Sequence, residues 1–214
     1  MSGENHHDFQ RKTGRVVVLT ALTMVVEIYF GLSTNSMALL ADGIHMGSHV
    51  LAIGISWLAY WYFRRVSSDP NFKGDSKKIL SLAGYTSGLM LLIFVVFIII
   101  EAMKRFFHPE QIFYQEAIFI AIIGLVVNII SAFLLHHDHD HGDDNIRAAY
   151  LHVLADALTS FSAILGLIAA KIWDLPYIDT AAALISSAVI VKWSIGLLKQ
   201  SGKSLLDITQ SKPN

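Results

Sequence analysis

The chain alternates long apolar stretches with short polar links. Six stretches approach the roughly 20 residues that a helix needs to cross a bilayer, and each contains few charges. We expect these spans near residues 16–32, 37–63, 79–103, 113–135, 146–170 and 178–198. The first two are separated only by residues 33–36, which predicts a tight helical hairpin. The pattern therefore predicts an all-α integral membrane protein with six transmembrane helices.

Polar segments flank the spans at both ends, at residues 1–15 and 201–214. Of the 16 lysines and arginines, twelve fall on the side of these two tails. Only Lys104, Arg105 and Lys171 fall on the opposite side, and Lys192 lies inside the last span. Because positive residues concentrate in cytoplasmic loops, this asymmetry predicts that both termini are cytoplasmic. We expect a multi-pass plasma-membrane protein, with the bacterial inner membrane as its location.

Composition supports a bilayer as the main partner of the chain. The sequence is 54% hydrophobic and 15% charged, and its mean hydropathy is +0.52. The net charge of −1 comes without a basic stripe, so we expect no nucleic-acid partner. There is no cysteine, which excludes disulfides and thiolate metal sites. A bound metal would therefore need nitrogen and oxygen ligands.

Two pairs of metal-ligand residues lie inside predicted spans, His45-x-x-x-His49 in the second and His152-x-x-x-Asp156 in the fifth. Such residues are costly in a bilayer, so their presence there indicates a function. A spacing of four residues puts each pair on one helix face, about 6 Å apart along the axis. Three imidazoles and a carboxylate suit zinc, cobalt or nickel, whereas magnesium and calcium prefer oxygen shells. The two spans run in opposite directions, which favours one shared site near the midplane.

Three further polar residues interrupt apolar stretches. Asp42 lies one turn outward of His45, where it either orients an imidazole or lines a water-filled outer vestibule. Asn128 is expected to form an interhelical hydrogen bond. Glu27 belongs either to an ion or proton path or to a pair with Lys192 or another helix.

The link between the fourth and fifth spans, residues 136–145, is rich in histidine and aspartate. Its imidazoles are those of His136, His137, His139 and His141. Such a tract is able to collect divalent cations weakly, which predicts a cytoplasmic metal-collecting loop. A solvated loop without such a role is the alternative.

Several segments together resemble the cation diffusion facilitator family. SMALLADGIHMGSHVLA is similar to its second-helix signature, and NIRAAYLHVLADALTS to its fifth-helix signature. Supporting similarity lies in residues 72–74, residues 82–85, Asn128 and the histidine-rich loop. The resemblance implies that residues 16–200 are a six-helix cation-efflux domain, usually homodimeric, that exports divalent metals in exchange for protons. It implies no enzymatic activity and no prosthetic group, and it gives the transport-site role to His45, His49, His152 and Asp156.

The chain departs from the family pattern in two ways. Zinc-transporting members usually have aspartate where this chain has His49. That histidine, together with Gly-Tyr-Thr-Ser at residues 84–87, is more similar to the cobalt/nickel-efflux branch. We therefore expect cobalt or nickel as cargo alongside zinc, with cadmium as a further candidate. The family also usually adds a cytosolic ferredoxin-like domain, so a chain ending soon after its sixth span is expected to be a short member or a truncated one.

A membrane-bound enzyme of the histidine-box desaturase or hydroxylase type is the alternative function. Such enzymes also use His-x-x-x-His pairs, but with further boxes near the cytosolic surface. Here His45 and His49 lie deep within a span, and the partner pair ends in Asp156. The sequence thus favours a secondary active transporter of divalent cations.

Overall fold

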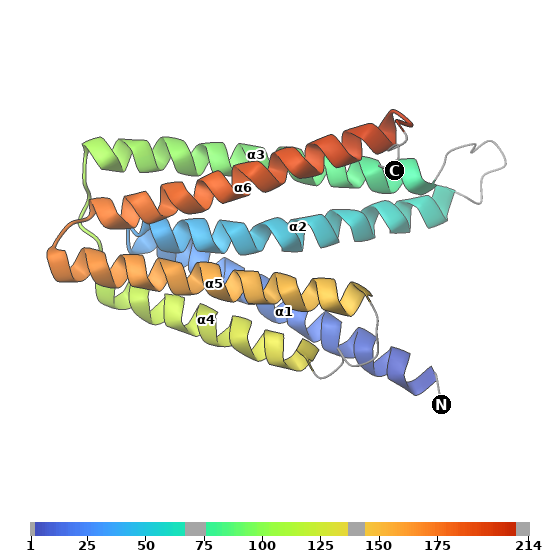
Figure 1. Cartoon of the computed structure of the whole chain (residues 1–214), viewed down its shortest axis with the longest axis horizontal. Helices are drawn as coiled ribbons and strands as arrows, with labels where there is room; N and C mark the ends of the chain where they lie inside the picture. Colours follow the sequence, from blue (N-terminus) through green and yellow to red (C-terminus); the bar gives the residue numbers. More distant parts are fainter. Residues whose placement is uncertain (1–2, 67–75, 137–143, 209–214) are drawn as a thin grey trace, which may run out of the picture. The chain divides into compact units, whose positions relative to one another are not determined.

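The computed structural model describes residues 3–66, 76–136 and 144–208, and these form six α-helices (Figure 1). The helices are α1 (Gly3–Ser33), α2 (Met37–Val66), α3 (Ser76–Phe107), α4 (Tyr114–His136), α5 (Asp144–Trp173) and α6 (Tyr177–Leu205). All six are long and apolar enough to cross a membrane. The predicted number and order of spans are confirmed, and an even number of spans puts both termini on the same side.

Most helices extend a few residues past the predicted bounds, and α1 and α6 extend furthest. Helix α1 begins at Gly3 rather than near residue 16, and α6 continues to Leu205 rather than ending near residue 198. Neither extension contains a proline, the residue that most strongly interrupts a helix. Hydropathy marks where a helix contacts lipid, whereas the hydrogen-bonded backbone continues past that boundary.

The predicted hairpin between the first two helices is confirmed, since α1 ends at Ser33 and α2 begins at Met37. Its turn includes Asn35 with φ of 58°, a left-handed conformation that asparagine tolerates. Gly31 lets the two helices approach closely, because a Cβ atom there would lie 2.6 Å from the backbone nitrogen of Leu40. The hairpin therefore depends on one glycine and one left-handed residue.

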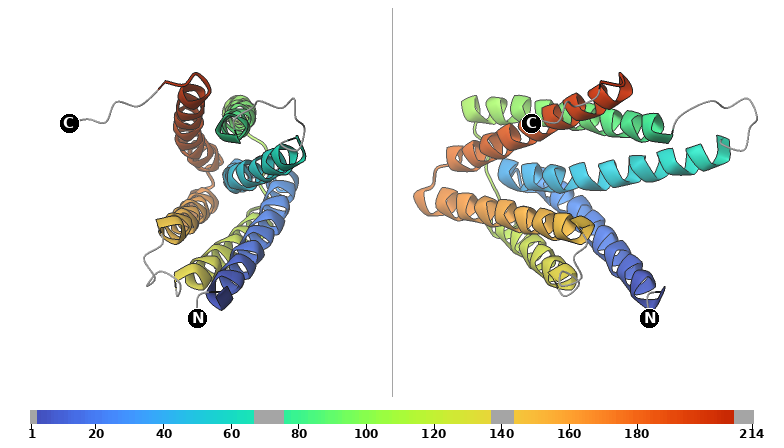
Figure 2. Two further views of the ribbon diagram at one scale, coloured as in Figure 1. Left: turned by 90° about the vertical axis from the view of Figure 1, so that its right-hand side faces the viewer. Right: turned by 45° about the vertical axis from the view of Figure 1, so that its right-hand side comes forward.

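The chain divides into two compact units. Unit 1 comprises Met1–Gly47 and Ile98–Ser187, and unit 2 comprises Ser48–Phe97 and Ala188–Asn214. In unit 1, α4 packs against both α5 and α1 (Figures 1 and 2). One apolar cluster of this unit consists of Leu39, Ile112, Ala117, Ile120, Ala121, Ile164 and Leu167. A second consists of Met37, Leu40, Ala41, Ile98, Ala102 and Ala183.

In unit 2, α3 and α6 pack through small residues. A Cβ atom at Gly88 would lie 3.0 Å from Cγ of Leu198. The hydroxyl groups of Ser81 and Ser204 are 2.6 Å apart. Small side chains that let helix backbones approach are the usual means of packing helices in lipid.

The distribution of polarity is the reverse of that in a water-soluble bundle. Phe119 and Ile185 are 64% and 70% exposed, whereas Glu27 and Asn128 are 0% and 1% exposed. A bilayer makes an apolar exterior stable and leaves polar groups to be satisfied inside the protein. The buried polar residues of unit 1 are therefore candidates for a functional site.

Candidate metal site and its surroundings

His45 on α2 and Asp156 on α5 lie side by side in unit 1. Nε2 of His45 is 3.4 Å from Oδ1 of Asp156, and the two side chains are only 4% and 3% exposed. One residue from each of the two predicted ligand pairs thus lies next to a residue of the other pair. A buried imidazole next to a carboxylate offers nitrogen and oxygen ligands to a divalent cation.

Packing around this pair shows that α2 and α5 run antiparallel in unit 1. Leu39 precedes His45 on α2 and shares a cluster with Ile164 and Leu167, which follow Asp156 on α5. Progress along α2 from residue 39 to 45 therefore corresponds to movement back along α5 from residue 167 to 156.

The other two predicted ligands are helical, but the structure does not describe their side chains. His49 lies one turn beyond His45 on α2, and His152 lies one turn before Asp156 on α5. The described side chains alone contain no group of three or more histidines, aspartates or glutamates able to hold a metal. The four-ligand site therefore stays a prediction.

Asp42 is almost completely buried, at 2% exposure. Neither of its carboxylate oxygens has a hydrogen-bond partner among the described residues. The structure shows neither a bond from Asp42 to His45 nor exposure to solvent, so both interpretations of this residue stay predictions.

Asn128 forms the interhelical hydrogen bond that the sequence predicted. Its Nδ2 donates to Oγ of Ser160 at 3.1 Å, and it also lies 3.9 Å from Sδ of Met46. Ser160 follows Asp156 by one turn on α5, and Met46 adjoins His45 on α2. Asn128 thus links α4 to the helix that positions the carboxylate of the pair.

Glu27 on α1 is fully buried, and neither carboxylate oxygen has a hydrogen-bond partner among the described residues. Lys192 belongs to the other unit, and its pairing with Glu27 stays a prediction. The carboxyl group faces Gly124 on α4 so closely that a side chain at that glycine would overlap Oε1.

Asp179 is a polar residue that sequence reasoning missed. From the start of α6 it accepts hydrogen bonds from Oγ of Ser36 (2.8 Å), the backbone nitrogen of Met37 (2.7 Å) and that of Ala38 (3.2 Å). It therefore caps α2, the helix that positions His45, and satisfies amide groups that no intrahelical bond can reach. The only local signal was a single acidic residue in the first turn of the sixth span.

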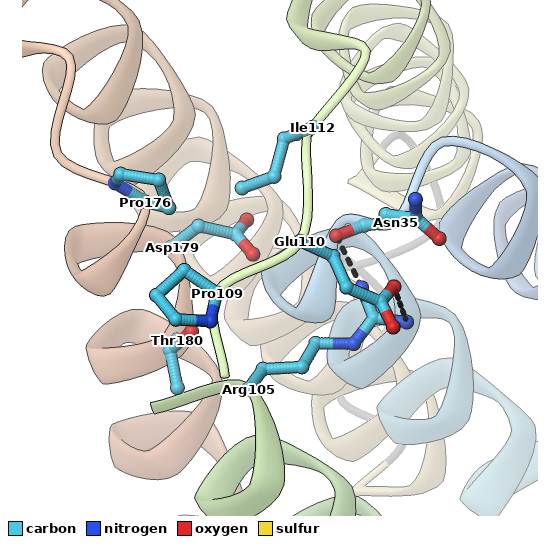
Figure 3. Close-up of a pocket in the computed structure, with 8 residues that line it drawn as sticks. All are labelled: Asn35, Arg105, Pro109, Glu110, Ile112, Pro176, Asp179 and Thr180. Atoms are coloured by element: carbon cyan, nitrogen blue, oxygen red, sulfur yellow. Dashed lines mark hydrogen bonds and ion pairs between the residues drawn. The ribbon is translucent and has the colours of Figure 1, made fainter. Parts of the chain in front are cut away.

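A pocket next to this cap is lined by charged and polar residues together with two prolines and an isoleucine (Figure 3). Its lining comprises Asn35, Arg105, Pro109, Glu110, Ile112, Pro176, Asp179 and Thr180. Arg105 donates to the carbonyl oxygen of Asn35 at 2.5 Å and pairs with Glu110 at 3.5 Å and Glu101 at 3.6 Å. These bonds tie the α1–α2 turn to the end of α3, which is a structural role.

The histidine-rich link gives no test of the predicted metal-collecting loop. His136 is the last residue of α4, and the structure does not describe its side chain. His137, His139 and His141 lie outside the described residues. The proposed role of this loop stays a prediction.

Comparison with known proteins shows similarity to cation transporters. The family described as the cation efflux transmembrane domain matches residues 15–206. The zinc transporter ZitB of Pectobacterium atrosepticum is 33% identical over 195 residues, covering 91% of this chain and 61% of that protein. The cadmium, cobalt and zinc/H⁺–K⁺ antiporter of Bacillus velezensis is 32% identical over 212 residues, covering 97% of this chain and 67% of that protein. ZitB of Escherichia coli is 32% identical over 189 residues, covering 88% of this chain and 60% of that protein.

The chain spans about 60% of the length of the ZitB relatives it matches. The family and these relatives are transporters, not enzymes, which removes the histidine-box enzyme as the alternative. The bacterial relatives support the inner membrane as the location. With six membrane-spanning helices and a family match over nearly the whole chain, the protein is a multi-pass membrane protein that belongs to the cation diffusion facilitator family.

Proposed function

We propose that this protein exports divalent transition-metal cations from the cytoplasm in exchange for protons. The observation that supports this most directly is the buried contact between His45 and Asp156, 3.4 Å apart on two helices. A histidine and an aspartate from distant parts of the chain meet inside an apolar bundle, where neither contributes to a hydrophobic core. Their position is explained if they bind an ion.

We propose His49 and His152 as the remaining ligands, because their spacing in the sequence puts each one helical turn from a member of the buried pair. One further turn along α2 leads from His45 to His49, and one turn back along α5 leads from Asp156 to His152. The four residues therefore suit a single four-coordinate site.

The chemistry of the ligands restricts the cargo. Three imidazoles and one carboxylate suit zinc, cobalt, nickel or cadmium better than magnesium or calcium. The relatives are named for zinc in one case and for cadmium, cobalt and zinc in another. We infer the same group of metals here, with cobalt and nickel favoured by His49.

Proton exchange follows from the ligands themselves. An imidazole must be neutral to bind metal, and an unperturbed histidine titrates near pH ~6.5. Metal binding therefore releases protons, and acid releases metal. The antiporter named among the relatives supports this exchange. Rocking between inward-open and outward-open forms would complete the cycle. From the family resemblance we also infer a homodimer. From its histidine and aspartate content we infer that the loop of residues 136–145 collects metal ions.

The test is metal uptake by proteoliposomes containing the full chain, across an imposed proton gradient, with cobalt, nickel, zinc, cadmium and manganese. Asp156→Ala and His45→Ala should each reduce uptake by more than about 100-fold, because even residues that merely support metal ligands cost ~10–100-fold. His108→Ala, which removes an exposed imidazole, is the matched control and should retain activity. Full uptake by both site variants would refute the site, and uptake insensitive to the gradient would refute proton exchange.

A further inference from the structure

Glu27 is a carboxyl group buried in unit 1 without an evident structural role. It is 0% exposed, and neither of its oxygens accepts a hydrogen bond from a described residue. Thr23, one turn earlier on α1, donates its hydroxyl proton to the carbonyl of Leu19 at 3.0 Å instead. A buried polar group without a partner is costly, so this position needs an explanation other than stability.

The neighbouring helices leave space for this side chain. A Cβ atom at Gly124 on α4 would overlap Oε1 of Glu27, and one at Gly43 on α2 would lie 3.0 Å from its Cβ. Two helices thus have glycine where they face Glu27. The carboxyl group occupies a site that both neighbours leave open.

Among the described residues of unit 1, the charged groups that act on Glu27 are acidic. Asp42 from α2 and Asp156 from α5 are close enough to act on it electrostatically, and α4 faces it with the uncharged Gly124. Asp42 is itself buried, and by strict hydrogen-bond geometry its oxygens have no partner among the described residues. Within the described part of unit 1, no lysine or arginine forms an ion pair with Glu27. An ionised Glu27 would therefore be an unpaired buried charge beside two like charges, which is strongly unfavourable.

We propose that Glu27 is a proton-binding site of the transport cycle, separate from the metal ligands. A proton needs only one carboxyl oxygen, whereas a larger cation would need a shell of oxygens that the described neighbours of Glu27 do not supply. The proton is bound while the metal site is empty. A divalent cation beside Asp156 replaces like-charge repulsion by attraction, so that Glu27 releases its proton as metal enters.

This inference rests on the proposed metal export and adds a proton to it. Protons leaving the imidazole ligands account for one part of the exchange, and the proton of Glu27 adds to them. Metal binding and proton release are then coupled by electrostatic interaction rather than by a shared ligand. The two contributions are separable by a variant that keeps every ligand.

The test is Glu27→Gln in the full chain, which keeps the shape of the side chain and cannot ionise. The protons released on zinc or cobalt binding are counted in weakly buffered detergent solution. We expect the variant to release about one proton fewer per metal, while its metal affinity changes less than tenfold. In proteoliposomes, the stimulation of uptake by a proton gradient should decrease. Glu101→Gln, a carboxyl in a surface ion pair, is the matched control and should release as many protons as wild type.

Gly124→Ala provides a second test, because the added methyl group displaces the carboxyl of Glu27 without removing it. It should also alter proton release while leaving all four proposed ligands in place. Unchanged proton release in Glu27→Gln would refute the inference, and so would failure of that variant to fold, since a carboxyl without a partner should be dispensable for stability. If wild type moves no metal, the proposed function fails; if wild type moves metal and Glu27→Gln releases as many protons, only this inference fails.

Discussion

At the scale of single residues, the bond between Asn128 and Ser160 links α4 to the helix that positions Asp156. In a bilayer no water competes for these groups, yet such bonds contribute only about 0.6–2 kcal/mol, because the unfolded chain finds other partners. The bond therefore matters more for the position of α5 than for the survival of the fold. Its strength can be measured by removing each partner.

Asn128→Ala should lower the free energy of unfolding by about 1 kcal/mol, as measured by denaturation in detergent. Ser160→Ala should have a similar effect, and the double variant should lose little more than either single one. Ser162→Ala is the control, because that hydroxyl bonds only to its own helix, at Leu158. Additive losses would show that the two side chains act independently.

Residue type and spacing predicted His45, Asp156 and Asn128 because such side chains are unusual inside apolar stretches. They did not predict Asp179, whose partner Met37 lies 142 positions away. Nor did they predict the role of Gly124. A glycine in a membrane helix does not indicate which side chain of another helix packs against it. Contacts of this kind depend on packing and are absent from local sequence.

At the scale of helices, the close packing of the α1–α2 hairpin leaves no room for a larger side chain at Gly31. Gly31→Ala would place a methyl group 2.6 Å from the backbone of Leu40, and backbone cannot move aside as a flexible side chain can. We expect a loss of about 1–3 kcal/mol in the free energy of unfolding, the usual cost of overpacking. Thermal denaturation in detergent measures this loss.

Gly54→Ala is the matched control on the same hairpin. Its new methyl group would have no described atom within 4 Å, so the change should be neutral or stabilising by about 0.5–1 kcal/mol through helix propensity. Equal stabilities of the two variants would contradict the close approach at Gly31.

Helix number and the short turn between α1 and α2 could be predicted because lipid contact sets both length and polarity. The ends of α1 and α6 could not, because polar residues continue a helix as well as apolar ones do. Hydropathy records the solvent around a helix rather than its hydrogen bonds.

At the scale of the whole molecule, metal binding should stabilise the fold in a pH-dependent way. A ligand at a hundredfold excess over its Kd adds about 2.7 kcal/mol to the free energy of unfolding. Imidazoles with ordinary pKa values are neutral above about pH 6.5 and protonated below it. The increase in Tm with zinc or cobalt should therefore be large at pH 7.5 and small at pH 5.5, as measured by thermal denaturation in detergent.

Magnesium is the control for this effect, because three imidazoles are poor ligands for it and no increase in Tm is expected. Asp156→Ala should lose the response to zinc as well. A metal response of equal size at both pH values would argue that histidine does not bind the ion.

The cap of α2 by Asp179 affects how loss of export in a variant is interpreted. Met37 lies eight residues before His45, or ~12 Å along the helix, so the cap is well away from the ion. A substitution at Asp179 would nevertheless free the first turn of the helix that presents His45 and mimic the loss of a ligand. Loss of export alone therefore cannot distinguish a residue that binds the ion from one that anchors the helix. The number of ions bound per chain does distinguish them.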